Sequence, residues 1–180
     1  NNRDGEQMKE MLSKSSRVYS VVKNELLDGT LRAGEWIDVP ALALRVGVSP
    51  TPVQHGLFVL TGEGLIQAHD RQGFHTPNYD EENLRDLFQL RTDLFLMAAS
   101  SAASESRGPE ISLTVPKREE ISRTISGLFL DLATASRRPL LREMIERLDD
   151  RLRLVQSAKL EIVPGLEEEY LAIVGAWKQR

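Results

Sequence analysis

The sequence predicts a mainly α-helical protein in which an N-terminal winged helix-turn-helix precedes an all-helical bundle. Three patterns support this prediction. A helix ended by glycine is followed at once by another helical stretch, at residues 47–60. Two short β-prone runs then surround a polar turn at residues 65–77, as in a β-hairpin. Beyond residue 80, apolar residues recur at helical spacing. We therefore expect a winged domain over residues 1–77 and a helical domain over residues 78–180.

The composition is that of a soluble globular protein, with 41% hydrophobic and 28% charged residues in a chain of 180. No apolar run approaches the roughly 20 residues of a membrane span. Residues 1–14 are polar and show no secretory signal. The absence of cysteine excludes disulfides, thiolate metal sites and cysteine nucleophiles. We expect a cytoplasmic protein that makes no use of a membrane.

The first helix of the winged domain follows from an apolar stripe that begins near residue 16 and stops at Asp28-Gly29. A turn and a short extended piece follow at residues 31–37. A second helix then starts after Asp38, with Pro40 in its first turn, where proline is tolerated. We expect this helix to turn three apolar side chains inward, namely Leu42, Leu44 and Val46.

A third helix begins directly after Gly47, which can take the positive φ that ends the preceding helix. Ser49 is a favourable N-cap for it. Val53, Leu57 and Leu60 recur at positions i, i+4 and i+7 and mark the buried face. Polar side chains cluster at the helix N-terminus, where a recognition helix meets phosphates and base edges. They are Ser49, Thr51, Gln54 and His55.

The helical domain begins with a helix that Asp80 or Glu81 can cap. Its apolar face runs from Leu84 to Ala102, and a loop rich in glycine and proline is expected at residues 104–116. Further helices are expected at residues 117–136, 139–158 and 164–178, which makes a bundle of at least four. The helix at 139–158 has a stripe at helical spacing, formed by Leu141, Met144, Ile145, Leu148, Leu152 and Val155.

The winged domain resembles the GntR family of bacterial transcription regulators. The resemblance rests on Leu31-x-x-Gly34-Glu35, Ala43-x-x-x-Gly47-Val48-Ser49-x-Thr51-Pro52-Val53 and Leu57-x-x-Leu60-x-x-x-Gly64-Leu65-Ile66. The helix at residues 84–91 is similar to the start of the effector domain (FCD domain) of the FadR-type subgroup. Residues 135–141, Ala-Ser-Arg-Arg-Pro-Leu-Leu, resemble that domain's usual Ala-Ser-Gly-Asn-Pro-Leu-Leu. The resemblance implies a homodimer that binds double-stranded DNA, and a shortened FCD-like domain that senses a small organic acid.

The recognition helix departs from the family pattern, which usually reads Val-Ser-Arg-Thr-Pro-Val-Arg-Glu-Ala-Leu. Pro50 and Gln54 replace its two arginines, and His55 replaces the glutamate. Each guanidinium contact to a guanine is worth about 1–3 kcal/mol when well made. Residues 1–79 hold eight Lys/Arg against nine Asp/Glu, a net charge of −1. We expect either a different operator, with Gln54 suited to an adenine edge, or weak binding.

Nine residues of the winged domain are candidates for DNA contact, by the resemblance and by their polar character. They are Arg32, Arg45, Ser49, Thr51, Gln54, His55, Arg71, Gln72 and Gly73. The last three form the tip of the wing, where Gly73 would allow close backbone approach. For His55 the alternative is an ordinary solvent-facing residue, and for the wing tip it is an ordinary polar hairpin turn. His69 and His75 flank the wing and are expected to be packing or surface residues.

Arg91 is the candidate effector-binding residue, because it lies on the otherwise apolar face of the helix that starts near residue 81. A buried arginine needs a partner. One reading is that its guanidinium holds the carboxylate of an effector. The other is that it forms an ion pair with an acidic residue of another element. Phe95, where the family often has a glutamate, indicates a more apolar pocket.

No metal or other cofactor is expected. FadR-type domains that hold a metal use one aspartate and three histidines, and the first two of these positions fall at Ile125 and Phe129. The third falls near Tyr170, and all three histidines of the chain lie in the winged domain. No combination of residues indicates an enzyme. We therefore expect a transcription regulator or, alternatively, a dimerisation and interaction module without specific DNA binding.

Overall fold

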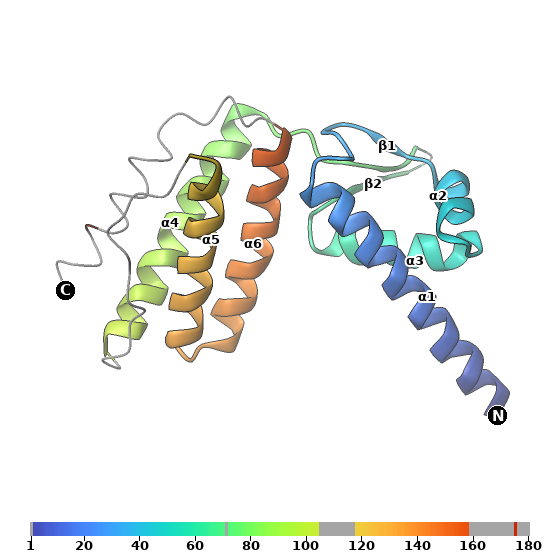
Figure 1. The fold of residues 1–180 in the computed structure, drawn as a ribbon, viewed down its shortest axis with the longest axis horizontal. Coiled ribbons are helices and arrows are strands. Elements are labelled where there is room, and N and C mark those ends of the chain that lie inside the picture. The colour runs from blue at the N-terminus through green and yellow to red at the C-terminus, as the bar shows by residue number, and fades with distance from the viewer. Residues whose placement is uncertain (1, 71, 105–117, 159–174, 176–180) are drawn as a thin grey trace. The chain divides into compact units, whose positions relative to one another are not determined.

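The computed structural model describes residues 2–70, 72–104, 118–158 and 175 (Figure 1). The chain divides into two compact units. The first holds the residues up to Tyr79 together with Arg153–Ala158, and the second holds Asp80–Leu152. Within the described ranges, no helix combines the length and the apolar character that crossing a membrane requires.

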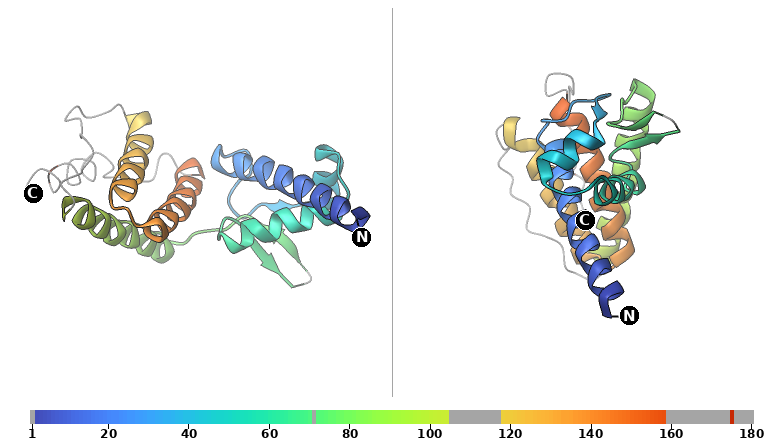
Figure 2. Two further views of the ribbon diagram at one scale, coloured as in Figure 1. Left: turned by 90° about the horizontal axis from the view of Figure 1, so that it is seen from below. Right: turned by 90° about the vertical axis from the view of Figure 1, so that its right-hand side faces the viewer.

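The first unit is a winged helix-turn-helix. Its elements are α1 (Asn2–Leu27), β1 (Trp36–Ile37), α2 (Val39–Val46), α3 (Pro50–Gly62), β2 (Gln67–His69) and β3 (Gly73–His75). The three strands form an antiparallel sheet in the order β1-β3-β2. Figure 2 shows the β2–β3 hairpin beside α3. The predicted hairpin is confirmed as β2 and β3. The extended piece predicted before α2 is β1, the third strand of the sheet.

The core of this unit is formed by one face of each helix and by the inner face of the sheet. The buried apolar residues include Val18, Val22, Leu26, Ile37, Leu42, Ala43, Val53, Leu57, Leu60, Leu65, Ile66 and Phe74. The predicted buried face of α3 is therefore confirmed. The prediction for Leu44 is wrong, because its side chain is 85% exposed. A helix turns by about 100° per residue, so Leu44 points away from the side on which Leu42 is buried.

Helices α1 and α3 cross closely at Gly56. A Cβ atom on Gly56 would lie 3.0 Å from the carbonyl oxygen of Ser15 and 3.2 Å from the backbone nitrogen of Tyr19. Further along, the Tyr19 hydroxyl donates to the Glu63 carboxylate at 3.0 Å, and Lys23 Nζ donates to that hydroxyl at 2.9 Å. Glycine at residue 56 thus sets how closely α1 supports the recognition helix.

We predict that Gly56→Ala destabilises the first unit by about 1–2 kcal/mol, although alanine is the better helix former by about 1 kcal/mol. The added methyl meets backbone atoms of α1, which cannot rotate away as a side chain would. Urea unfolding followed by circular dichroism measures the change. Gly62→Ala is the matched control on the same helix, because nothing lies within 4 Å of its added methyl. Equal effects of both substitutions would contradict the prediction.

The second unit contains α4 (Glu81–Ser104), α5 (Arg118–Ala135) and the part of α6 (Pro139–Ala158) that ends at Leu152. These helices lie next to one another in Figure 1. Asp80 caps α4 as predicted, since its Oδ1 accepts a hydrogen bond of 2.7 Å from the Asn83 N–H. The core draws on all three helices, through Leu87, Leu94, Phe95, Ala98, Ile125, Leu128, Phe129, Leu132, Leu141, Ile145, Leu148 and Leu152. Met144 is 47% exposed, so its predicted inward position is wrong.

The turn between α5 and α6 contains Arg137, whose φ of 51° is unusual for a residue other than glycine. The FCD-domain pattern has glycine at this position, and glycine adopts such a positive φ without strain. Nothing in the structure explains why this chain has arginine there. Ser136 closes the end of α5 by donating its hydroxyl to the Ala133 carbonyl at 2.7 Å. Ser104, the first residue of the loop predicted at residues 104–116, is the last residue of α4. The rest of that loop and nearly all of the helix predicted at residues 164–178 lie outside the described residues.

Candidate nucleic-acid interface

Helix α2, which precedes the turn into α3, is capped at both of its ends. Asp38 caps α2 by accepting a hydrogen bond of 2.9 Å from the Ala41 N–H. At the other end Gly47 has a φ of 72°, and its N–H donates to the Ala43 carbonyl at 2.9 Å. The Arg17 guanidinium donates to the Val46 carbonyl at 2.9 Å. The predicted helix-ending role of Gly47 is confirmed, and α3 starts three residues later, at Pro50.

The N-terminus of α3 offers few donors to a phosphate. Ser49 occupies the N-cap position as predicted, but its side chain makes no capping hydrogen bond. Pro50 and Pro52 have no N–H, which leaves Thr51 with the only amide N–H among the first three helical residues. A phosphate bound here would meet fewer amides than an ordinary helix N-terminus presents. The Ser49 hydroxyl remains exposed to solvent.

The outward face of α3 carries Thr51, Gln54, His55 and Phe58, all exposed. Their spacing is i, i+3, i+4 and i+7, the spacing with which a homeodomain helix reads the major groove. Residues 50–62 contain no Lys, Arg, Asp or Glu, so this face is uncharged. Phe58 is 59% exposed, and sequence reasoning missed it. The sequence could have identified Phe58 as exposed, because it does not share the helix face of Val53, Leu57 and Leu60.

Several cations of the winged unit are already neutralised by carboxylates. Arg45 Nη2 lies 2.8 Å from Glu25 Oε2, and a second contact joins Nη1 to Oε1. Hydrogen bonding to Glu25 raises the pKa of Arg45. Lys14 lies 2.7 Å from Glu10 and Lys23 lies 3.4 Å from Glu63. Among the predicted contacts, Arg32 lies exposed on the loop after α1, whereas Arg45 would have to leave Glu25 to meet a phosphate fully.

The wing presents a polar tip and an aromatic face. Gln72 and Gly73 are exposed at the tip, and Gly73 has a φ of 79°. Arg71 lies outside the described residues. On the face turned away from Phe74, the ring of His75 lies 5.3 Å from that of Trp36 and 4.3 Å from that of His69. The Nδ1 atom of His75 is buried and makes no hydrogen bond.

We predict that the winged unit becomes less stable as the pH falls below about 6.5, the ordinary histidine value. Burial, and secondarily the charge of His69, lower the pKa of His75. The unfolded chain therefore binds more protons in this range, so stability rises with pH and is lost on acidification. Urea unfolding between pH 7.5 and 5.5 measures the dependence.

The His75→Gln variant should show a weaker pH dependence of stability than the unchanged protein. His55→Gln is the matched control, because it removes an exposed imidazole from α3. An identical pH dependence in the His75→Gln variant and in the unchanged protein would refute the assignment.

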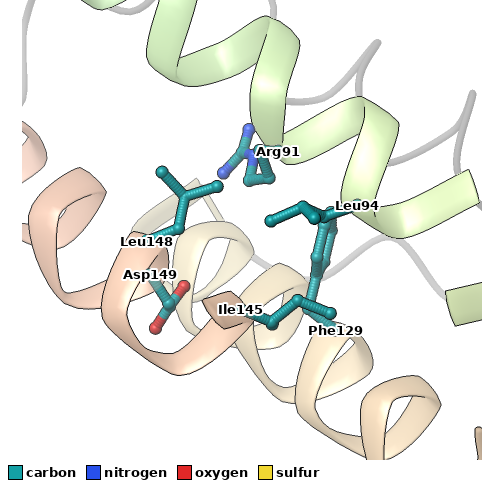
Figure 3. Close-up of a pocket in the computed structure, with 6 residues that line it drawn as sticks. All are labelled: Arg91, Leu94, Phe129, Ile145, Leu148 and Asp149. Carbon is teal, nitrogen blue, oxygen red and sulfur yellow. The ribbon is translucent and has the colours of Figure 1, made fainter. Parts of the chain in front are cut away.

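Arg91 lies in the second unit and is 4% exposed. Its guanidinium carbon lies 4.8 Å from the ring centre of Phe88 and 5.7 Å from that of Phe129. Figure 3 shows the small cavity that it lines together with Leu94, Phe129, Ile145, Leu148 and Asp149.

The volume of this cavity is about 10 Å³, which is roughly the space for one water molecule. The Asp149 carboxylate accepts a hydrogen bond of 2.5 Å from the Ser126 hydroxyl. A carboxylate of the protein itself, that of Asp149, therefore already lines the cavity beside Arg91.

The two positions at which the resemblance would place metal ligands carry apolar side chains buried in the bundle. Ile125 is 1% exposed and Phe129 is 4% exposed. Among the described residues, no group of three or more His, Cys, Asp or Glu side chains is placed to hold a metal ion. The position near Tyr170 falls outside the described residues.

Comparison with known proteins gives one family and several relatives. Residues 14–75 match the family described as bacterial regulatory proteins, gntR family. The chain is 27% identical over 109 residues to the uncharacterized HTH-type transcriptional regulator YdhC of Bacillus subtilis strain 168, covering 61% of this chain and 49% of YdhC. It is 26% identical over 174 residues to the HTH-type transcriptional regulator McbR of Escherichia coli K12, covering 90% of this chain and 74% of McbR.

Two solved structures share the fold. E. coli McbR/YncC has a TM-score of 0.62 at 21% identity, covering 92% of this chain and 86% of that one. A putative GntR regulator from Rhodococcus sp. RHA1 has a TM-score of 0.66 at 16% identity, covering 93% and 91%. The chain thus spans about half the length of YdhC and most of McbR. The winged helix-turn-helix over residues 14–75 thus matches that of the gntR family of bacterial regulatory proteins.

Proposed function

We propose that this protein is a bacterial transcription regulator that binds double-stranded DNA through α3 and the wing, and that it catalyses no reaction. The observation that carries the proposal is the outward face of α3. Thr51, Gln54 and His55 lie exposed on the second helix of a helix-turn-helix, where such proteins read base edges. The family match over residues 14–75 covers the same elements. Cytoplasmic location and the other predicted contacts, Arg32, Ser49, Gln72 and Gly73, belong to this proposal.

Selection from a random pool of duplex DNA tests the proposal with the full chain. We expect enrichment of a common sequence and tighter binding of that sequence than of a scrambled duplex. The dependence of log affinity on log salt should be shallow, because its slope reflects the number of phosphates neutralised and α3 supplies no cation. Failure to enrich any sequence at about 50 mM salt would sink this function.

A second candidate function is an interaction module that has lost specific DNA binding. It is favoured by the uncharged α3 and by the ion pairs that occupy Arg45, Lys14 and Lys23. The same selection decides between the two functions. An interaction module would retain no duplex above background.

The proposal extends to a homodimer whose helical unit responds to a small organic acid. Arg91 would hold the acid's carboxylate. Since the cavity beside it is water-sized, binding requires the helices around it to separate. Sedimentation analysis tests the dimer. Thermal unfolding with a panel of small organic acids tests the effector, and a concentration-dependent rise in Tm is the expected result.

A further inference from the structure

We propose that Phe58 is a specificity-determining residue that reads the methyl group of thymine in the major groove. This inference rests on the proposed function, because it requires that α3 enters DNA. It adds a residue to the reading face and names the base that this residue recognises. The half-site that follows from it is rich in A·T pairs, with adenine facing Gln54 and thymine facing Phe58.

The position of Phe58 on α3 is the first argument. Phe58 follows Thr51 by seven residues and Gln54 by four, so all three share one face of the helix. The opposite face is buried through Val53, Leu57 and Leu60. Residues at i, i+3, i+4 and i+7 of one helix face can all reach base edges in the groove. Phe58 is therefore the last member of a reading face that begins at Thr51.

The chemistry of this face is the second argument. Guanine presents two acceptors in the major groove and is read by arginine or lysine, and α3 has neither. Thymine presents a C5-methyl group, which apolar side chains such as Phe contact. Gln can hydrogen-bond an adenine at N6 and N7. An uncharged face with one amide and one exposed phenyl ring thus matches A·T pairs better than G·C pairs.

The support of the phenyl ring is the third argument. The rings of Phe58 and Phe74 make a T-shaped contact, with ring centres 5.1 Å apart and planes at 74°. Phe74 is a buried residue of β3, so the Phe58 ring rests on the core of the unit on one side. The ring nevertheless keeps 59% of its surface exposed. A ring fixed on one side and open on the other can contact a methyl group without losing much conformational entropy.

Uracil substitution tests the inference on the unchanged protein. Uracil lacks only the C5-methyl of thymine, so each thymine of the site enriched from the random pool is replaced by uracil in turn. We expect one position in each half-site at which affinity falls about fourfold, the effect of burying one methyl group. Binding that is equally tight with uracil at every position overturns the inference.

Variants of Phe58 assign the effect to this residue. Phe58→Ala should bind thymine and uracil duplexes equally, whereas Phe58→Leu should keep part of the preference. A Phe58→Ala variant that still prefers thymine fourfold also overturns the inference, because another group must then read the methyl. If the unchanged protein enriches no sequence, the proposed function itself fails and this inference fails with it. Circular dichroism confirms that each variant is folded.

Discussion

Replacing Arg91 by alanine is expected to lower the free energy of unfolding of the helical unit by about 2–3 kcal/mol, somewhat less than the roughly 3–5 kcal/mol of breaking a fully buried ion pair. The guanidinium lies near the rings of Phe88 and Phe129 and lines the same cavity as the Asp149 carboxylate. Alanine removes the ring contacts and takes the guanidinium out of a cavity that the Asp149 carboxylate also lines. Hydrogen exchange of the α4 amides in the full chain measures the loss in this unit.

Arg85→Met is the matched control for Arg91→Met on the same helix. The Arg85 guanidinium lies 2.8 Å from Glu81 on an exposed surface, and such pairs contribute about 0–1 kcal/mol. We expect Arg85→Met to be nearly neutral and Arg91→Met to be destabilising. Comparable effects of the two substitutions would show that burial of Arg91 has no structural importance.

The Arg91 variants also separate the two readings of this residue. A purely structural arginine predicts that no organic acid raises the Tm of the unchanged protein. An effector-binding arginine predicts that one acid does so, and that Arg91→Lys weakens the shift at equal stability. With a cavity of about 10 Å³ that Asp149 already lines, an acid can bind beside Arg91 only if the surrounding helices separate. A ligand-induced rise in Tm that is lost in Arg91→Lys would support the effector-binding reading, and its absence with every acid would support the structural one.

The winged fold was predictable because its signals are local. Asp38 and Gly47 mark helix ends through caps that depend on a few neighbouring residues, and Asp80 does the same at the start of the helical unit. Leu44 and Met144 were predicted wrongly for a different reason. Leu44 is two residues from Leu42, a spacing that suits a strand and not a helix. Met144 fits the helical spacing but lies at the margin of the stripe, where only the packing of neighbouring helices decides burial.

The candidate site was predictable in outline but not in its electrostatics. Sequence reasoning placed polar residues on the start of α3 because of motif and spacing. It could not foresee that Glu25 would engage Arg45, since these residues lie 20 positions apart and meet only through tertiary packing. It also overlooked Phe58, because an apolar residue is assigned to the core unless the face it occupies is checked. Exposure in the fold is what identified it.

Placing arginine at residues 50 and 54, where the family pattern has it, should make α3 read guanine. We expect the Pro50→Arg, Gln54→Arg double variant to bind guanine-containing half-sites at least about tenfold more tightly than the unchanged protein, since one bidentate contact is worth about 1–3 kcal/mol. Pro50→Arg also returns an amide N–H to the first turn of α3. Fluorescence anisotropy with paired duplexes, with and without guanine in the half-site, measures the change.

The preference between the two duplexes, and not affinity alone, decides this prediction. Any added cation strengthens binding to all duplexes through the phosphates. Asn24→Arg is therefore the control, because Asn24 is exposed on α1 and outside the reading face, and this variant should tighten both duplexes equally. The double variant should prefer the duplex that contains guanine. It should also lose the thymine preference associated with Phe58 if the added side chains change which bases α3 contacts. Equal tightening of both duplexes by the double variant would mean that residues 50 and 54 do not face base edges. The reading face of α3 would then have to be reassigned.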